Sequence, residues 1–340
     1  MTTRTLITGA TGFVGGLLAA RLVAEGRPVR ALVRSLGDRE RLPDPRVELA
    51  IGNLDDEDSL VRAADGCEVV YHVAGLNTMC PLDPKLLYEV NVEGTRRMLD
   101  AARAAGARRL VLTSSAGVLG GDGGAPVDED APPPAHLPSE YARSKLAAER
   151  LALAFDGIEV VAVSPSSVQG PGRRSGTAKL LLDFLNGKLP VSVPSTFGLC
   201  YTDDCAAGHL LAAAAGRPGR RYVLNSATVT TAQAFGLVAE LVGLPRGPRE
   251  LPPPLAMAMA AAVEAVARAR GRQPSLCREA ARTMLHPHRY DGSRAERELG
   301  VSYTPLRTAL ERTVRWYAAA GLLKRPLPGL PALAARRERA

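Results

Sequence analysis

A glycine-rich turn near the N-terminus constrains the fold more strongly than any other feature of this sequence. The string T-G-A-T-G-F-V-G places Gly9, Gly12 and Gly15 at intervals of three residues. It follows the apolar run 5–8, which predicts a strand, and precedes 15–25, whose spacing predicts a helix. Glycine permits a tight turn with close backbone approach, and the N-terminus of the next helix offers free N–H groups to a phosphate. The turn therefore predicts nucleotide binding, and a glycine-rich turn without a ligand is the alternative.

Strand and helix patterns alternate along the first 165 residues. Short, apolar and often β-branched runs predict strands at 29–33, 47–50, 69–73, 109–113 and 159–163. Amphipathic spacing predicts helices at 56–64, 85–105 and 141–155. This alternation predicts an α/β fold, a Rossmann-type doubly wound parallel sheet covered by helices on both faces.

The rhythm changes after Pro165. Shorter helices are predicted at 178–186, 233–242, 254–270, 293–299 and 306–319, with extended pieces at 222–225 and 250–251. We therefore predict an NAD(P)-binding domain at 1–165 and a smaller mixed substrate-binding lobe at 166–322, interleaved with the sheet. Residues 323–340 carry prolines and a basic end, which predict a disordered tail.

The composition is that of a globular protein, with 46% apolar and 23% charged residues. No run reaches the 18 apolar residues of a transmembrane helix, and the N-terminus lacks the pattern of a signal peptide. The net charge of +8 comes from 43 basic residues, of which only five are lysines. Such an arginine bias can arise from the base composition of a gene, so no nucleic-acid partner is predicted.

Five cysteines are scattered along the chain without a C-x-x-C pair: Cys67, Cys80, Cys200, Cys205 and Cys277. An odd, dispersed set argues against a disulfide framework. The cysteines are therefore expected to be packing residues in a reducing, cytoplasmic location. Asp203 and Asp204 have no third ligand nearby, so we expect a helix cap and a contact with the lobe rather than a metal site.

The residues that follow the second predicted strand bear on the choice of cofactor. Dinucleotide sites often place a carboxylate there to accept the ribose hydroxyls of NAD. This chain has A-L-V-R-S, so Arg34 and Ser35 stand at that point instead. They suit a 2′-phosphate and favour NADP(H), whereas Asp38 lies close enough to bind the ribose and keeps NAD(H) as the alternative.

Taken together, these and later strings resemble the extended short-chain dehydrogenase/reductase superfamily. The matching strings are G-N-L-D-D at 52–56, H-V-A-G at 72–75, N-V-E-G-T at 91–95, T-S-S-A at 113–116, Y-A-R-S-K at 141–145 and S-P-S-S-V-Q-G-P-G at 164–172. The chain is most similar to the dihydroflavonol-reductase-like branch and its hopanoid-associated epimerase/reductase group, through D-F-L-N-G-K-L-P at 183–190.

The resemblance implies a set of cofactor-binding positions. They are Gly9, Thr11, Gly12, Phe13, Val14, Gly15, Arg34, Ser35, Asn53, Leu54, Asp55, Val73, Ala74, Gly75, Asn91, Tyr141, Lys145, Pro165 and Val168. Asn91 has two readings, either an anchor or proton relay of the site or a helix-start residue that holds its own backbone. His72 is expected to be a strand residue near the cofactor.

Tyr141 and Lys145 lie four residues apart on a predicted helix, so both side chains share one face. A phenol has a pKa of about 10, which a nearby ammonium and the positive nicotinamide would lower. The tuned phenol can then transfer a proton to or from a substrate oxygen. Ser115 is the candidate to polarise that oxygen, with Ser114 as its close rival. The predicted substrate contacts are Leu76, Asn77, Ser114, Ser115, Ala116 and Ser167.

We expect hydride transfer between NAD(P) and a mid-sized, fairly apolar carbonyl or alcohol. A nucleotide-sugar epimerase is the alternative, and a non-catalytic cofactor-binding regulator is a third hypothesis. Sugar dehydratases carry an Asp-Glu pair where this chain has Ala116–Gly120, and nucleotide-sugar enzymes often have an asparagine where it has Ser166 and Ser167. The family resemblance also implies a homodimer through 85–105 and 141–155.

Overall fold

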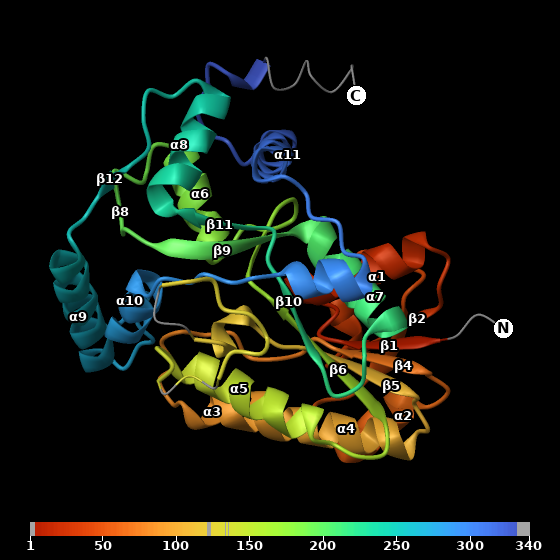
Figure 1. The fold of residues 1–340 in the computed structure, drawn as a ribbon. Coiled ribbons are helices and arrows are strands. Elements are labelled where there is room, and N and C mark those ends of the chain that lie inside the picture. The colour runs from red at the N-terminus through yellow and green to blue at the C-terminus, as the bar shows by residue number, and fades with distance from the viewer. Residues whose placement is uncertain (1–3, 121–123, 133, 135, 332–340) are drawn as a thin grey trace.

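The computed structural model describes residues 4–120, 124–132, 134 and 136–331. Its centre is a parallel sheet of seven strands in the order β10-β6-β5-β4-β1-β2-β3 (Figure 1). The strands are β1 (Thr5–Thr8), β2 (Val29–Val33), β3 (Glu48–Ile51), β4 (Val69–His72), β5 (Arg109–Thr113), β6 (Glu159–Pro165) and β10 (Arg221–Leu224). Chain order reverses between β1 and β4, and ligands bind beside such a switch point at the carboxyl ends of the strands.

Helices cover both faces of this sheet, as the apolar strands require (Figure 1). On one face, α1 (Phe13–Ala24) and α7 (Thr202–Ala215) pack over a core that includes Leu18, Val111 and Tyr222. On the other, α2 (Glu57–Ala64), α4 (Gly94–Ala104) and α5 (Glu140–Leu153) pack over Leu60, Met98 and Leu110. The predicted α/β fold with its Rossmann-type sheet is confirmed.

The helix predicted at 85–105 is confirmed as one helical run from Lys85 to Ala104, with a π turn inside it. It consists of α3 (Lys85–Tyr88), a π-helical turn at Glu89–Glu93 and then α4. A single π turn inside a helix often marks a functional site. Here the turn carries Asn91, whose side chain is buried.

The C-terminal half builds a separate lobe above the sheet (Figure 1). It holds a three-stranded sheet of β11 (Ala227–Thr230), β9 (Thr196–Tyr201) and β7 (Ser167–Gln169), and a small pair of β8 (Val191–Ser192) and β12 (Arg249–Glu250). Its helices are α6 (Thr177–Leu185), α8 (Thr231–Val242), α9 (Pro253–Ala269), α10 (Arg278–Leu285) and α11 (Leu306–Ala319). A π turn at Ala295–Leu299 instead packs into the core of the central sheet. A 3-10 turn at Leu36–Arg41 and another at Ala116–Val118 lie in the N-terminal half.

A third core joins α6, α8 and α11 around Phe184, Val238 and Val314. Leu327 belongs to it and is buried, and the Arg325 side chain donates to the carbonyl of Leu185 over 2.7 Å. Residues 324–331, which were expected to form part of a disordered tail, therefore pack against the lobe instead. The rest of that predicted tail, 332–340, lies outside the described residues.

The cysteines depart from expectation, because Cys80 and Cys277 form a disulfide. The two residues lie 197 positions apart, so no local spacing could reveal the pair. The prediction of unpaired packing cysteines was wrong for these two, whereas Cys67, Cys200 and Cys205 are buried free thiols. Among the described residues, no helix is long and apolar enough to cross a membrane.

Candidate active site

The glycine-rich turn lies between β1 and α1, and sterics account for two of its glycines. Gly9 has a φ of +73°, and a Cβ there would lie 2.8 Å from the backbone nitrogen of Ala74. A Cβ at Gly15 would lie 2.2 Å from the carbonyl oxygen of Gly9. Neither position accepts a side chain without moving backbone, so the turn and the end of β4 pack against each other directly.

The same turn leaves the N-terminus of α1 open. Gly12 is its N-cap, which makes no side-chain cap bond, and the first turn holds no acidic residue. The helix N-terminus therefore presents its N–H groups and its positive dipole end without a competing side chain of its own. Together with the close backbone approach at Gly9 and Gly15, this geometry fits the pyrophosphate of a dinucleotide, with Thr11, Phe13 and Val14 at the same edge.

After β2, the candidate ligands of the cofactor ribose and its 2′-phosphate differ in the contacts that they already make within the protein. The Asp38 carboxylate accepts the backbone N–H groups of Arg34 and Ser35, over 3.2 and 3.3 Å, and pairs with Arg41. Asp38 is thus occupied in capping the 3-10 turn that follows. The Arg34 side chain is exposed, as is Ser35.

The ends of β3 and β4 flank this edge. After β3, the Asn53 side chain accepts the N–H of Leu54 over 2.9 Å, and Asp55 is exposed. After β4, the chain continues extended through Val73, Ala74 and Gly75. The predicted cofactor residues of four segments are therefore gathered at the carboxyl edge of one sheet (Figure 1).

Asn91 anchors the segment that follows Gly75. Its Oδ1 accepts the N–H of Leu76 over 2.7 Å, and its Nδ2 donates to the Leu76 carbonyl over 3.1 Å and to Ser144 Oγ over 3.0 Å. The π turn places this buried side chain between the β4 end and α5. Of the two readings that the sequence left open, the contacts favour the anchor, because Asn91 holds the backbone of another segment.

Helix α5 carries Tyr141 and Lys145 on one face. It begins where it does because the Ser139 hydroxyl caps it, accepting the N–H of Ala142 over 3.1 Å. The Lys145 Nζ donates to the carbonyl of Thr113, the last residue of β5, over 2.7 Å.

Lys145 is buried at this position. Burial lowers the pKa of its ammonium from 10.5 to about 8, partly opposed by the negative charge of Glu149. A Cβ added at Gly75 would lie 3.8 Å from its Nζ and 3.0 Å from Asn91 Oδ1. The glycine after β4 therefore faces both polar side chains, which converge beside the switch point.

The Tyr141 phenol differs from the sequence-based expectation. Burial raises its pKa to about 12, opposed by a hydrogen bond with Ser115 and by the positive charge of Arg173. We expected the Lys145 ammonium to lower this pKa, but that ammonium is directed to the Thr113 carbonyl instead. Desolvation is the largest influence on the pKa of the phenol.

The two candidate serines have different surroundings. Ser115 lies close enough to Tyr141 to lower the pKa of the phenol, and its Oγ accepts the N–H of Gly117 over 3.2 Å. Ser114 is buried, and its hydroxyl has no hydrogen-bond partner within the part of the chain that the structure describes. Only Ser115 is brought into contact with the phenol.

Arg173 was missed by sequence reasoning. Its guanidinium lies 5.1 Å from the ring centre of Phe13, on the glycine-rich turn, and its charge acts on Tyr141. The available signal was its place in the loop G-P-G-R-R, directly after the string that resembles the nicotinamide segment. A lone arginine in a loop carries no spacing that would single it out.

The remaining predicted residues lie around this centre. Ser167 and Val168 are on β7, Pro165 ends β6, Ala116 is buried after β5, and Asn77 is exposed. His72 is fully buried between Thr8 and Thr95, 2.8 and 3.2 Å away, and burial lowers its pKa to about 3. It is a neutral strand residue, as expected.

Asp204 makes the expected contact with the lobe. Its carboxylate accepts the backbone N–H and the hydroxyl of Thr304, over 2.8 and 2.7 Å. No group of three potential metal ligands occurs among the described residues.

A doubly wound sheet whose first turn carries sterically required glycines defines a dinucleotide-binding α/β protein. The chain belongs to the NAD-dependent epimerase/dehydratase family, whose model matches residues 5–224. The resemblance to extended short-chain dehydrogenases/reductases is thereby confirmed. The chain is an enzyme of a family with NAD(P)-dependent reductases, dehydrogenases and epimerases that act on CH–OH groups.

Two relatives are each 34% identical to this chain over 94% of its length. They are "Sterol demethylase protein B" of Methylococcus capsulatus, covered over 99% of its own length, and a "Putative dihydroflavonol 4-reductase" of a Synechocystis strain, covered over 95%. The solved structure of gox2253 is 31% identical, with a TM-score of 0.82 over 95% of this chain and all of that chain. MoeE5 in complex with UDP-glucuronic acid and NAD is 25% identical, with a TM-score of 0.75 over 93% and 99% of the two chains.

Proposed function

We propose that this protein is an NAD(P)-dependent oxidoreductase that interconverts a carbonyl and an alcohol on a mid-sized, fairly apolar molecule. The observation that carries the proposal is the place of Ser115 beside Tyr141, where it lowers the pKa of the phenol, with buried Lys145 on the same helix as Tyr141. All three lie at the carboxyl edge of the sheet, beside the glycine-rich turn.

The bound dinucleotide supplies or accepts the hydride. Tyr141 holds the proton that passes to the substrate oxygen during reduction, and it accepts that proton during oxidation. Ser115 donates a hydrogen bond to the same oxygen and so orients it toward the phenol. Lys145 provides positive charge at the site, and Asn91 keeps the Leu76 backbone fixed beside it.

The substrate class rests on the relatives and on residue types. The names of the two relatives refer to a sterol and a dihydroflavonol, which are largely apolar ring systems. The segment after β4 is L-N-T-M-C-P-L, which offers mostly apolar side chains. A nucleotide-sugar epimerase is the second candidate, favoured by the likeness to MoeE5 with its UDP-sugar, but Ser166 and Ser167 stand where the resemblance expects an asparagine.

We propose NADP(H) as the preferred cofactor. The exposed Arg34 is available to a 2′-phosphate, whereas Asp38 is engaged with backbone N–H groups and Arg41. Arg34→Ala should raise the KM for NADPH about tenfold or more and leave that for NADH nearly unchanged, because a charged hydrogen bond is lost. Arg62→Ala, on α2, is the matched control, and an unchanged preference in Arg34→Ala would refute the assignment.

The reaction is tested by titrating the purified protein with NADPH and NADH and assaying steroid and flavonoid ketones beside UDP-sugars. We expect cofactor oxidation with a ketone and a drop of about 100-fold or more in kcat for Tyr141→Phe. Conversion of a UDP-sugar without net cofactor oxidation would establish the epimerase instead. A homodimer through α4 and α5 is proposed from the family resemblance, and sedimentation velocity measures it.

A further inference from the structure

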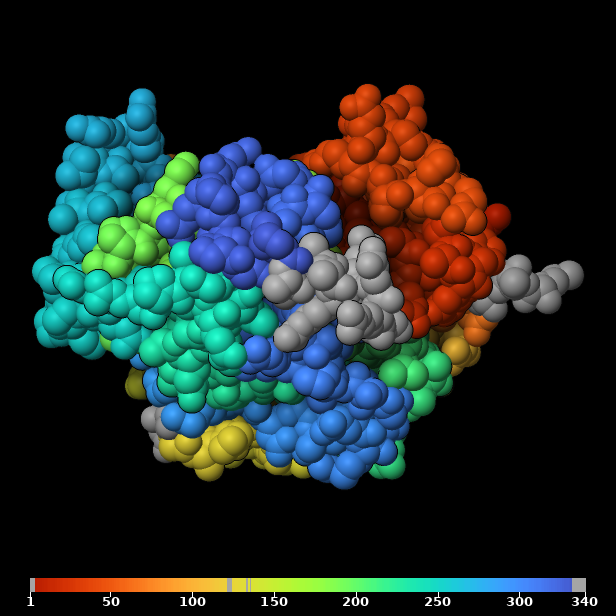
Figure 2. All heavy atoms as spheres, turned by 90° about the horizontal axis from the view of Figure 1, so that it is seen from above, coloured from red at the N-terminus to blue at the C-terminus, as the bar shows by residue number. Residues whose placement is uncertain are grey.

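The outer face of α9 is apolar and exposed along its whole length. Leu255, Met259 and Val266 are 54%, 42% and 52% exposed. Further exposed small residues continue the stripe at helical spacing: Ala258, Ala262, Ala265 and Ala269. A surface helix of a globular protein normally turns such a stripe toward the core. Figures 1 and 2 place α9 at one edge of the molecule, on the side opposite to β1 and β2.

The opposite side of α9 attaches it to the lobe. Ala256 and Ala260 are buried, and Glu264 pairs with Arg268 and Arg278. The one carboxylate of this helix is therefore engaged in holding α10 and does not interrupt the outer stripe. The helix is oriented so that Leu255, Met259 and Val266 face outward.

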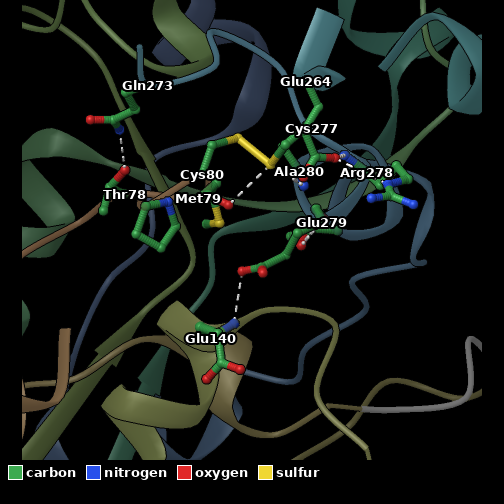
Figure 3. The surroundings of a disulfide bond; sticks show 12 residues. Thr78, Met79, Cys80, Glu140, Glu264, Gln273, Cys277, Arg278, Glu279 and Ala280 are labelled. Carbon is green, nitrogen blue, oxygen red and sulfur yellow. Dashed lines mark hydrogen bonds and ion pairs between the residues drawn. A yellow bond between two sulfur atoms is a disulfide. The ribbon is translucent and has the colours of Figure 1, made fainter. Parts of the chain in front are cut away.

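Covalent and hydrogen-bonded contacts link α9 and α10 to the segment after β4. The Cys80–Cys277 disulfide joins the segment after β4 to the start of α10, and Gln273 donates to Thr78 beside it (Figure 3). The Arg268 side chain donates to the Pro81 carbonyl over 3.5 Å. The next residues of that segment extend the apolar surface, because Leu82 and Leu86 are 51% and 54% exposed.

Positive charge lies at the C-terminal end of the stripe and in the segment that follows it. From 253 to 285 the sequence holds five arginines and two carboxylates, Glu264 and Glu279. Glu264 is paired with arginines, and Glu279 accepts the backbone N–H of Glu140 over 2.8 Å (Figure 3). Arg270, Arg272 and Arg282 are exposed at the same end of the molecule.

This charge pattern distinguishes between two possible binding partners of the surface, a second copy of the chain and a lipid bilayer. A second copy of the chain would bring the same five arginines against few exposed carboxylates, namely Asp83 beside Leu82 and Glu250 before α9. A bilayer with anionic lipids offers both an apolar interior for the stripe and negative headgroups for the arginines. We propose that α9, with Leu82 and Leu86, is a docking surface on which this protein binds an anionic lipid bilayer, the helix lying in the plane of the interface.

The proposal is tested by sedimenting the full-length protein with vesicles of phosphatidylglycerol and phosphatidylcholine, and with vesicles of phosphatidylcholine alone. We expect binding to the anionic vesicles that falls as salt is added. Met259→Glu with Val266→Glu should abolish it. Arg270→Glu with Arg272→Glu should weaken it by about tenfold or more, since each basic residue near a charged surface adds to the attraction.

Matched controls use sites away from this surface. Leu36→Glu removes another exposed leucine, and Arg62→Glu with Arg150→Glu reverses two charges on α2 and α5, so both should bind as the wild type does. Circular dichroism confirms that every variant is folded. Absence of binding by the folded wild type, or unchanged binding by the Met259 and Val266 variant, overturns the proposal. So does a lipid-free dimer that this variant dissociates in sedimentation velocity, because a second copy then covers α9.

Discussion

Replacing Lys145 with methionine should remove activity and at the same time stabilise the ligand-free protein. Burial lowers the pKa of the ammonium from 10.5 to about 8, so the folded state holds the charge less readily than the unfolded chain. A shift of this size corresponds to about 3 kcal/mol of destabilisation at pH 7. Methionine has a similar length and no charge. It leaves the Thr113 carbonyl without its lysine partner, which costs about 1–2 kcal/mol.

The expected net gain at pH 7 is therefore about 1–2 kcal/mol in the free energy of unfolding. The pH dependence identifies its source. Below pH 8 the folded wild type carries the full penalty of a buried charge, and the penalty disappears as the pH rises from about 8 to 10.5. Between pH 7 and 9.5 the wild type should gain about 2 kcal/mol relative to Lys145→Met.

Urea unfolding of both proteins at several pH values measures this difference, with the ligand-free state verified by absorbance. Lys145→Arg is the control, because it keeps the charge and should not be stabilised. A methionine variant that is less stable than the wild type at pH 7, or a difference between the two that does not change with pH, would refute the reasoning. The lysine would then lie in a polar environment that already solvates its charge.

Three further perturbations test other parts of the structure. Gly15→Ala should weaken NADPH binding about tenfold or more, because its Cβ would lie 2.2 Å from a carbonyl oxygen. Gly16→Ala is the control, since its Cβ meets nothing closer than 3.4 Å. Fluorescence titration with NADPH compares the two variants. Arg173→Met removes a cation that lowers the pKa of Tyr141, so the acid limb of the pH profile for alcohol oxidation should move to higher pH. Cys277→Ser opens a loop of 197 residues, and chain entropy places the loss of unfolding free energy at up to about 5 kcal/mol in non-reducing urea titrations.

Each of these has an outcome that contradicts it. Equal NADPH affinity in Gly15→Ala and Gly16→Ala would mean that the turn adapts to a side chain. A pH profile that stays in place in Arg173→Met would remove that cation from the site. Wild type reduced with dithiothreitol should unfold like Cys277→Ser, and a reduced wild type as stable as the oxidised one would show that the disulfide contributes nothing.

Six strands of the central sheet could be predicted from sequence because each is a short apolar run between clear turns, although β3 is exposed at both ends and β10 was expected in the lobe. Helix α7 was missed for the converse reason. Its buried residues include Cys205, His209 and Ala212, which lie on several sides of the helix, so it has no polar stripe to show a helical period. The three-stranded sheet was also missed, since β7, β9 and β11 are separated along the chain and pair only after the chain has folded back.

Some residues of the candidate site could be predicted from sequence, and others could not. Tyr141, Lys145 and the glycines could be predicted from sequence because each set has a fixed spacing within one short segment. Ser115 could be told from Ser114 only by its contact with the phenol, and Cys80 and Cys277 only by their approach in space. The direction of the pKa change at Tyr141 depends on burial, which a sequence does not record.

The position of β10 has a consequence for how this chain folds while the ribosome is still making it. This strand pairs with β6 at the end of the sheet, although the lobe segment 166–220 separates the two along the chain. A ribosome therefore releases β6 with one side of its backbone unpaired, and that edge stays open until Arg221–Leu224 has emerged. Open edges of apolar strands recruit other chains. Prematurely terminated products that end before β10 should therefore aggregate, whereas those that end after it carry a completed sheet.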